Sequence, residues 1–109
     1  MATTYKVLGQ SAPSATTATT LYTVPSATEA VISTIVVCNR AASAATYRIS
    51  VRPDGASQAN QHYIAYDATV SANDSTALTL GITLDAADVV TVYASTADLS
   101  FNAFGSEIS

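Results

Sequence analysis

Apolar and polar residues alternate along much of the chain, and the alternation predicts β-strands. The clearest case is STALTLGITL (75–84), in which Leu78, Leu80, Ile82 and Leu84 fall on one face and small or hydroxyl residues fall on the other. A period of two is expected for a strand with one buried face. We therefore expect these four side chains to point into a core.

A second segment, ATYRISVRP (45–53), has the same period. Its alternation places three apolar side chains inward and three polar ones outward: Tyr47, Ile49 and Val51 inward, and Arg48, Ser50 and Arg52 outward. By contrast, AVISTIVVC (30–38) is apolar on both faces, which predicts a central strand that is covered on both sides. No segment has apolar residues at helical spacing, and the many Val, Ile, Thr and Tyr residues favour pleated strands.

Turn signals separate these apolar runs. RPDG (52–55), SAND (71–74) and DAAD (85–88) carry residues that turns favour. They leave eight short strands, at about 4–9, 19–24, 29–39, 45–52, 61–66, 76–84, 88–95 and 98–104. Eight short strands in 109 residues favour an all-β, single-domain antiparallel β-sandwich with a jelly-roll-like build, and an open barrel is the alternative.

The N-terminal region differs in composition from the rest. Residues 1–20 are expected to hold a strand followed by QSAPSATTATT (10–20), which is low in bulky side chains and forms a loop or an extended arm. Residues 21–109 are expected to hold the sandwich, with one domain overall. The final SEIS (106–109) is expected to lie along the surface. On this view, a chain trimmed of residues 1–20 stays folded but no longer joins its assembly.

Low charge limits the classes of partner. Only 11% of the residues are charged, and the net charge is −4. The four cations, Lys6, Arg40, Arg48 and Arg52, are too scattered to neutralise several phosphates, so nucleic acid is not an expected partner. No run approaches the roughly 20 apolar residues of a spanning helix, so no membrane is expected either. Few lysines protect strand edges, which favours burial against other subunits.

Candidate chemistry is sparse. His62 is the only histidine, and without a nucleophile elbow such as G-x-S-x-G it is interpreted as a surface or structural residue. Cys38 is the only cysteine and is expected to be a buried, inert thiol. Oxygen ligands at Asp67, Asn73 and Asp74 are compatible with Ca²⁺, but their spacing matches no EF-hand. We therefore expect no catalytic residue, no metal ion, no cofactor and no enzymatic activity.

Aromatic rings with an apolar body and a polar tip are enriched where proteins meet. The rings expected to serve in this way, together with the one histidine, are Tyr5, Tyr22, His62, Tyr63 and Tyr66. Tyr47 is instead expected in the core, because it falls on the inner face of its segment.

Two long phrases carry a resemblance to a known group. TTLYTVPSATEAVISTIVVCNRAASAATYRISV and LTLGITLDAADVVTVYASTADLSFNAFGSEI resemble small virion structural proteins of tailed bacteriophages, including phages of marine bacteria and cyanobacteria. In that group an LYTVP strand leads into an apolar strand that ends at a CN or CNR corner. A DVVTVYAST strand then precedes an F-x-x-FG ending, matched here by Phe101, Phe104 and Gly105. The resemblance covers about residues 4–108.

The resemblance implies a virion protein, assembled in the host cytoplasm, whose β-sandwich binds other phage structural proteins. The expected role is a capsid decoration or cement protein that contacts the major capsid protein as a homo-oligomer, with a trimer as one arrangement. A neck, tail or baseplate protein is the first alternative. The second alternative comes from another class: a host-glycan-binding module that uses Tyr63 and Tyr66.

Overall fold

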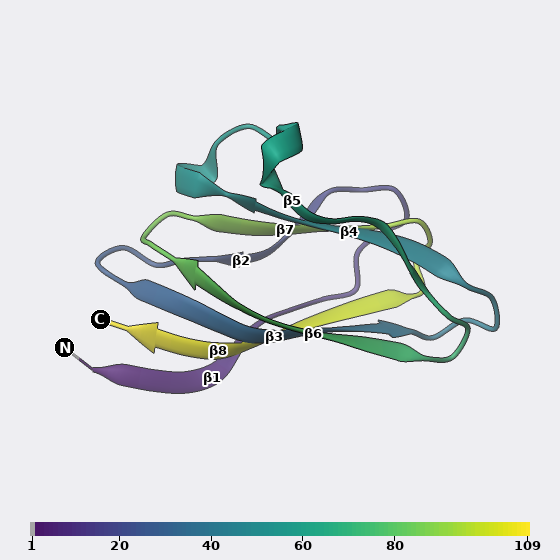
Figure 1. The fold of residues 1–109 in the computed structure, drawn as a ribbon, viewed down its shortest axis with the longest axis horizontal. Coiled ribbons are helices and arrows are strands. Elements are labelled where there is room, and N and C mark those ends of the chain that lie inside the picture. The colour runs from purple at the N-terminus through teal and green to yellow at the C-terminus, as the bar shows by residue number, and fades with distance from the viewer. Residues whose placement is uncertain (1) are drawn as a thin grey trace.

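The computed structural model describes residues 2–109 as two packed antiparallel sheets (Figure 1). Sheet A contains, in spatial order, β1 (Thr3–Ser11), β8 (Leu99–Ile108), β3 (Glu29–Asn39) and β6 (Ser75–Leu84). Sheet B contains, in spatial order, β2 (Thr19–Thr23), β7 (Val89–Ala94), β4 (Ala45–Arg52) and β5 (Tyr63–Val70). Two short 3-10 helices lie between β4 and β5: η1 (Pro53–Gly55) and η2 (Asn60–His62).

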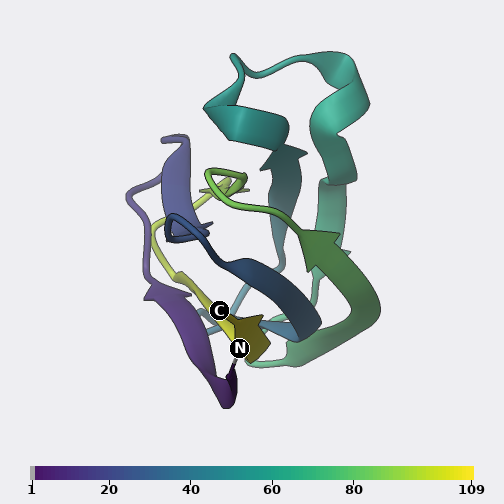
Figure 2. The same ribbon diagram turned by 90° about the vertical axis from the view of Figure 1, so that its left-hand side faces the viewer.

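The strand order is that of a jelly roll. Sheet A runs β1-β8-β3-β6, sheet B runs β2-β7-β4-β5, and all neighbouring strands are antiparallel. Eight strands in two sheets of this kind form the double-sheet jelly roll. Figure 2 shows the two layers from one end of the sandwich. The predicted all-β, single-domain antiparallel sandwich is therefore confirmed, and the alternative of an open barrel is wrong.

The core lies between the two sheets and is built from the inner-face residues of both. Phe101 and Tyr47 are buried and meet edge to face, with their ring centroids 6.2 Å apart. Ile35, Ile49 and Leu99 are fully buried in the same cluster. Each such side chain contributes about 1.5–3 kcal/mol on burial, which holds the sheets together. Tyr47 is thus a core residue, as its place in the alternating pattern predicts.

Strand β3 is central in sheet A but is covered on one face only. Ile32, Ile35 and Val37 are buried in the core, whereas Val31 and Val36 on the outer face are only half-buried. The prediction of coverage on both sides is therefore wrong for the single chain. The apolar outer positions of β3 belong to a surface that no other layer of this chain covers.

The predicted inner face of β6 is interrupted at Leu80, which is 52% exposed. Leu84 is buried, and Leu78 and Ile82 pack against the core, as the alternation predicts. Between these positions Leu80 and Gly81 form an irregularity in the register with β3, and Gly81 has a φ of +64°. A β-bulge inserts an unpaired residue and redirects its side chain. The expected inward position of Leu80 is therefore corrected.

The connection that follows β4 covers a residue expected to be exposed. Ser50 is buried, and its hydroxyl donates a hydrogen bond to Gln58 Oε1 at 2.7 Å. Val51 packs against the core, as predicted. The strand expected at 61–66 begins later, at Tyr63, because the preceding residues form η2. The outward, solvated position predicted for Ser50 is thus wrong, since tertiary contacts of the connection bury it.

Both ends of the described part of the chain, residues 2–109, are paired into sheet A. β1 pairs with β8 along its length, and Leu8 packs against the core. The predicted surface trail at 106–109 is instead the end of β8, next to which Ala2 and Ser109 exchange backbone hydrogen bonds of 2.6 and 2.9 Å (Figure 1). Trimming residues 1–20 would remove an edge strand and the start of β2, so the trimmed chain is no longer expected to keep this fold.

Each of the four edge strands carries an irregularity in its pairing. The edges of sheet A are β1 and β6, and those of sheet B are β2 and β5. The register shifts occur at Leu8 in β1, Leu21 in β2, Tyr66–Asp67 in β5 and Leu80–Gly81 in β6. Bulges twist an edge away from a straight partner strand and so oppose edge-to-edge pairing. The scarcity of lysine therefore does not leave the edges unprotected, which corrects that expectation.

Two glycines allow backbones to approach closely. A Cβ on Gly9 would lie 2.1 Å from the carbonyl oxygen of Leu21, where the edge of sheet A meets that of sheet B. A Cβ on Gly105 would lie 1.9 Å from the carbonyl oxygen of Val31, next to the register shift of β3 at Ser33. Neither contact is possible for a side-chain-bearing residue unless a backbone moves. These two positions therefore require glycine.

We predict that Gly105→Ala lowers the free energy of unfolding by roughly 1–3 kcal/mol, because the added methyl group must displace the backbone of β3. Urea unfolding of both chains measures the difference. Ser106→Ala, at the next position of β8, is the matched control and is expected to change stability by less than about 0.5 kcal/mol. Equal urea midpoints for the two variants would contradict the requirement for glycine at position 105.

Candidate interaction surfaces

The outer face of sheet A is free of charged side chains over most of its length. Cross-strand partners point to the same side of a sheet, so the pairing identifies the residues that share this face. We call it the uncharged face, and its residues are Tyr5, Val7, Gln10, Val31, Thr34, Val36, Cys38, Ser75, Ala77, Thr79, Thr83, Ser100, Asn102, Phe104 and Ser106. Glu29 lies at its border, at the first position of β3. The cores of protein interfaces are depleted of charge in the same way.

Three apolar side chains of the uncharged face are well exposed. Tyr5 is 84% exposed, Val7 is 47% exposed and Phe104 is 37% exposed. Val7 is the direct cross-strand partner of Phe104, and Tyr5 is the partner of Ser106, so all three lie on the neighbouring strands β1 and β8. Exposed apolar side chains that gather in this way are typical of binding surfaces.

An open hollow of about 560 Å³ lies beside these side chains. It is bounded by residues of three adjacent strands: Tyr5, Lys6 and Val7 of β1, Phe104, Gly105 and Ser106 of β8, and Val31 and Ser33 of β3. We call it the β8 hollow, because β8 runs between the other two strands. Gly105 and Ser106 have small side chains, so they form the floor of the hollow, and the larger side chains around them form its walls. A side chain from another molecule has room there.

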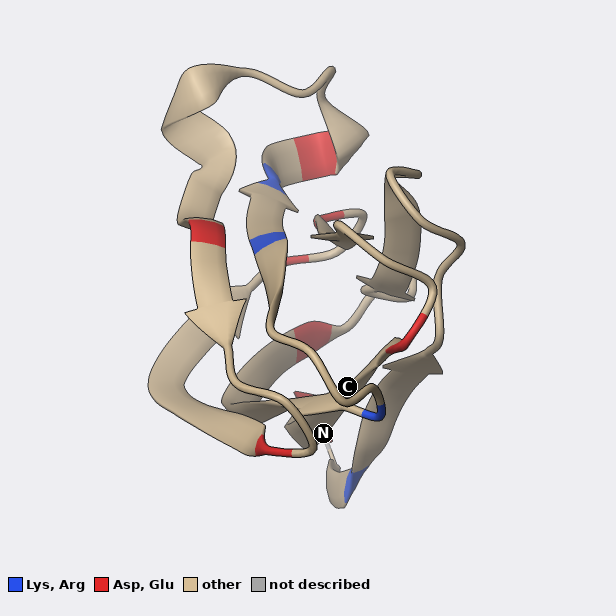
Figure 3. Cartoon of the chain, turned by 90° about the vertical axis from the view of Figure 1, so that its right-hand side faces the viewer, with Lys and Arg blue, Asp and Glu red and all other residues tan. Residues whose placement is uncertain are grey.

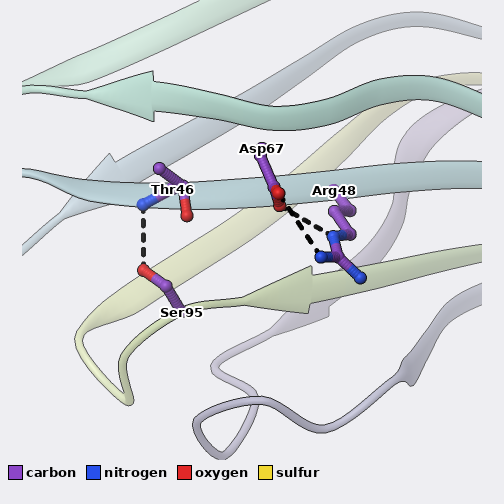
Figure 4. Close-up of polar contacts among 4 residues, drawn as sticks. All are labelled: Thr46, Arg48, Asp67 and Ser95. Carbon is purple, nitrogen blue, oxygen red and sulfur yellow. Dashed lines mark hydrogen bonds and ion pairs between the residues drawn. The ribbon is translucent and has the colours of Figure 1, made fainter.

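The outer face of sheet B holds a cluster around Arg48. The guanidinium lies over two rings, 4.2 Å from the centroid of Tyr66 and 4.5 Å from that of Tyr93. It also donates a hydrogen bond to Asp67 Oδ1 at 2.7 Å (Figure 4). Tyr63 meets Tyr66 edge to face, with centroids 4.9 Å apart. We call these five residues the Arg48 cluster, and tyrosine and arginine are the residue types that dominate interface energetics.

Backbone geometry positions the Arg48 cluster. Asp67 lies at the irregularity of β5 with a φ of +51°, opposite Arg48 on β4. The hydrogen bond from Arg48 to this carboxylate raises the pKa of the guanidinium, which stays charged. Near the start of β4, two residues before Arg48, the backbone N–H of Thr46 donates to Ser95 Oγ at 2.9 Å (Figure 4). β4 is thus fastened on both sides, and the cluster sits on a fixed frame.

The predicted interface residues do not form one surface. His62, Tyr63 and Tyr66 lie together at η2 and the first half of β5, whereas Tyr5 lies on the outer face of the other sheet. His62 has a structural contact, because its Nδ1 accepts a hydrogen bond from the backbone N–H of Ala59 at 3.1 Å. The structure therefore divides these residues between the uncharged face and the region of the Arg48 cluster.

Tyr22 is removed from the surface altogether. Its side chain is buried, and its hydroxyl donates a hydrogen bond of 2.5 Å to Glu107 Oε2. Glu107 Oε1 in turn pairs with Lys6 Nζ at 2.7 Å. Burial and the neighbouring carboxylate raise the pKa of Tyr22, while the hydrogen bonds from Lys6 and Tyr22 lower the pKa of Glu107. Tyr22 is thus part of a link between β2, β8 and β1, which corrects its expected place at an interface.

Other candidate chemistry has ordinary surroundings. Cys38 is partly exposed on the uncharged face, so its predicted full burial is wrong. Both carboxylate oxygens of Asp67 bond to Arg48, and Asp74 Oδ1 accepts a hydrogen bond from the N–H of Ser75. Among residues 2–109, no group of three or more His, Cys, Asp or Glu side chains is placed to hold a metal ion. Within the same residues, no helix has the length and apolar character needed to cross a membrane.

Sequence reasoning missed several members of the two surfaces. Val7 meets Phe104 only because β1 and β8, from opposite ends of the chain, are neighbours in sheet A. Tyr93 meets Arg48 only because β7 pairs with β4. The outward direction of Arg48 follows from the alternating pattern, and Phe104 belongs to the F-x-x-FG ending. The pairing of strands that brings these residues together leaves no local signal in the sequence.

Comparisons with known proteins add no relative. No family model, no curated protein and no solved structure matches the chain. Assignment of a function therefore rests on the two surfaces, the fold and the resemblance of the sequence phrases.

We predict that Glu107→Gln lowers the free energy of unfolding at pH 7 by about 1 kcal/mol, because the amide cannot replace the carboxylate toward Lys6 and Tyr22. The folded protein lowers the pKa of Glu107 below its ordinary value of 4.5. Its contribution is therefore complete above pH 4.5 and is lost as the pH falls through the folded pKa. Urea unfolding of both chains across this range measures the difference, which should shrink in acid.

Glu29→Gln is the matched control for this prediction, because Glu29 is exposed at the start of β3. It is expected to leave stability nearly unchanged at either pH. A Glu107→Gln effect that is as large in acid as at pH 7 would contradict a contribution from the carboxylate.

Proposed function

We propose that this chain is a non-enzymatic structural subunit of a tailed-phage virion, and that it serves as a capsid decoration or cement protein. The observation that carries the proposal is the presence of two contact surfaces on opposite layers of one sandwich. The uncharged face lies outside sheet A, and the Arg48 cluster lies outside sheet B. A protein that stabilises a shell must hold at least two neighbours at once, and a rigid sandwich with a surface on each layer has that form.

The composition of the two surfaces supports contact with protein. The uncharged face can be buried without leaving unpaired charges, which is the main electrostatic cost of burial. In the Arg48 cluster, the guanidinium is already paired with Asp67 and stacked on Tyr66. Its partners are therefore fixed before binding, which reduces the entropy lost on association.

The bulged edges support the same role. An assembly protein that adds strands at its edges can grow into fibres, whereas contacts through defined faces can close into a lattice. Because every edge strand carries an irregularity, faces are the available contact surfaces. The jelly roll also recurs in viral capsid domains, although this point is an analogy of fold alone.

The resemblance of the sequence phrases supports a virion location and phage structural proteins as partners. The major capsid protein is the partner that a decoration or cement role requires. A neck, tail or baseplate protein would use the same two surfaces in a ring, and only the number of copies separates that role from decoration.

Glycan binding ranks below these roles. Tyr63 and Tyr66 lie close together, as a sugar-stacking platform would require. However, Arg48 lies over the ring of Tyr66. The ring of Tyr63 also meets the ring of Tyr66 edge to face. These contacts occupy ring surface that a sugar would need.

We predict that purified particles contain this chain in a number on the order of one copy per major capsid subunit, because a decoration or cement protein follows the symmetry of the head lattice. Quantitative mass spectrometry against the major capsid protein measures the ratio. A far smaller number would favour the neck, tail or baseplate role. Absence from purified particles would contradict a virion function.

A further inference from the structure

The uncharged face carries a protruding ring and a recess side by side. Tyr5 is 84% exposed, and it also forms one wall of the β8 hollow. We propose that a second copy of this chain docks on the uncharged face, with the Tyr5 ring of each copy seated in the β8 hollow of the other. The proposal rests on the proposed function in one respect, since it assigns a second copy of the chain as the partner of the uncharged face.

Symmetry requires both parts of the contact on one face. In a two-fold contact the same patch appears on both subunits, so a group that inserts must lie near the site that receives it. Tyr5 and the β8 hollow meet this requirement because they lie on the adjacent strands β1 and β8. A ring that fills an apolar hollow in a partner is the usual form of an interface hot spot. The contact closes with two copies, so we infer a dimer rather than a trimer.

Charge favours the same face for contact between copies. Each chain has a net charge of −4, so two copies repel wherever acidic side chains face each other. Figure 3 shows acidic and basic positions spread thinly around the molecule. The outer face of sheet A, inside the border formed by Glu29, contributes none of them. Lys6 lies at the edge of the β8 hollow, and its charge is already paired with Glu107 at 2.7 Å. Two copies can therefore approach through this face without opposing like charges.

The size of the face is sufficient for a weak to moderate dimer. Four strands spaced about 4.8 Å apart, each about 30 Å long, give a surface of roughly 600 Å². Two such surfaces would bury about 1,200 Å² in total, at the lower end of the range for specific interfaces. Edge-to-edge association is opposed by the bulges, so face-to-face contact is the geometry that remains.

Self-association of the purified chain tests the proposal. Sedimentation velocity over a range of protein concentrations should show a monomer–dimer equilibrium. Tyr5→Ser should raise the dimer dissociation constant by at least about tenfold, because it removes the inserted ring. Tyr5→Phe keeps the ring and should keep the dimer. Ile64→Ser, which removes an exposed apolar side chain from the other sheet and outside the Arg48 cluster, is the matched control and should leave the equilibrium unchanged.

A second pair of variants tests the face independently of the ring. Val7→Lys places a charge on the wall of the β8 hollow and should weaken the dimer to a similar extent. The two-fold contact contains residue 7 of both copies, so two added charges would be buried in the interface. Ile64→Lys is the control, since Ile64 of β5 is 44% exposed and Val7 is 47% exposed. All variants alter exposed positions, and circular dichroism with urea unfolding verifies that each remains folded.

Three results would overturn the inference: a chain that stays monomeric at every concentration, a trimer, or a dimer that Tyr5→Ser and Val7→Lys leave intact. None of these results changes the expected copy number in particles, so the proposed function would stand or fall by that separate measurement. Conversely, a dimer lost with Tyr5→Ser would support the inference even in a chain that is absent from virions.

Discussion

The fit of β8 between β1 and β3 is the contact on which the rest of the structure depends. At Gly105 the backbone of β8 comes so close to Val31 that no side chain can be accommodated. Next to this contact, the hydroxyl of Ser33 donates a hydrogen bond to the carbonyl oxygen of Phe104 at 3.0 Å. The resulting register turns Phe101 into the core and Phe104 outward. Core packing and the surface around the β8 hollow thus follow from one local arrangement.

Much of the fold can be predicted from residue pattern, because alternation reports which side chains are buried. The strands at 29–39 and 45–52 have the expected bounds, and Tyr47 is in the core. Alternation fails at bulges, as at Leu80, where a backbone irregularity rather than a residue type sets the direction of the side chain. It also fails where tertiary contacts cover a polar residue, as at Ser50.

The candidate surfaces were harder to predict than the fold, because they depend on which strands become neighbours. Tyr22 and Tyr5 are both tyrosines in predicted strands, yet one is buried beside Glu107 and the other is almost fully exposed. The residues next to each tyrosine do not report which strand of the other sheet will lie against it. The jelly-roll strand order decides which tyrosine is buried, since it places β2 over the end of β8 and leaves β1 at the edge of sheet A. Low charge was the one compositional signal that pointed toward buried surfaces.

The pairing of Ala2 with Ser109 has a mechanical consequence. These two residues end neighbouring antiparallel strands, and they are joined directly by backbone hydrogen bonds. Tension applied between the two ends would act along the ladder bonds of β1 and β8 and break them one pair after another, like a zipper. Pressure across the layers would instead meet a densely packed interior. The molecule is therefore expected to resist compression across its two sheets far better than tension between its termini.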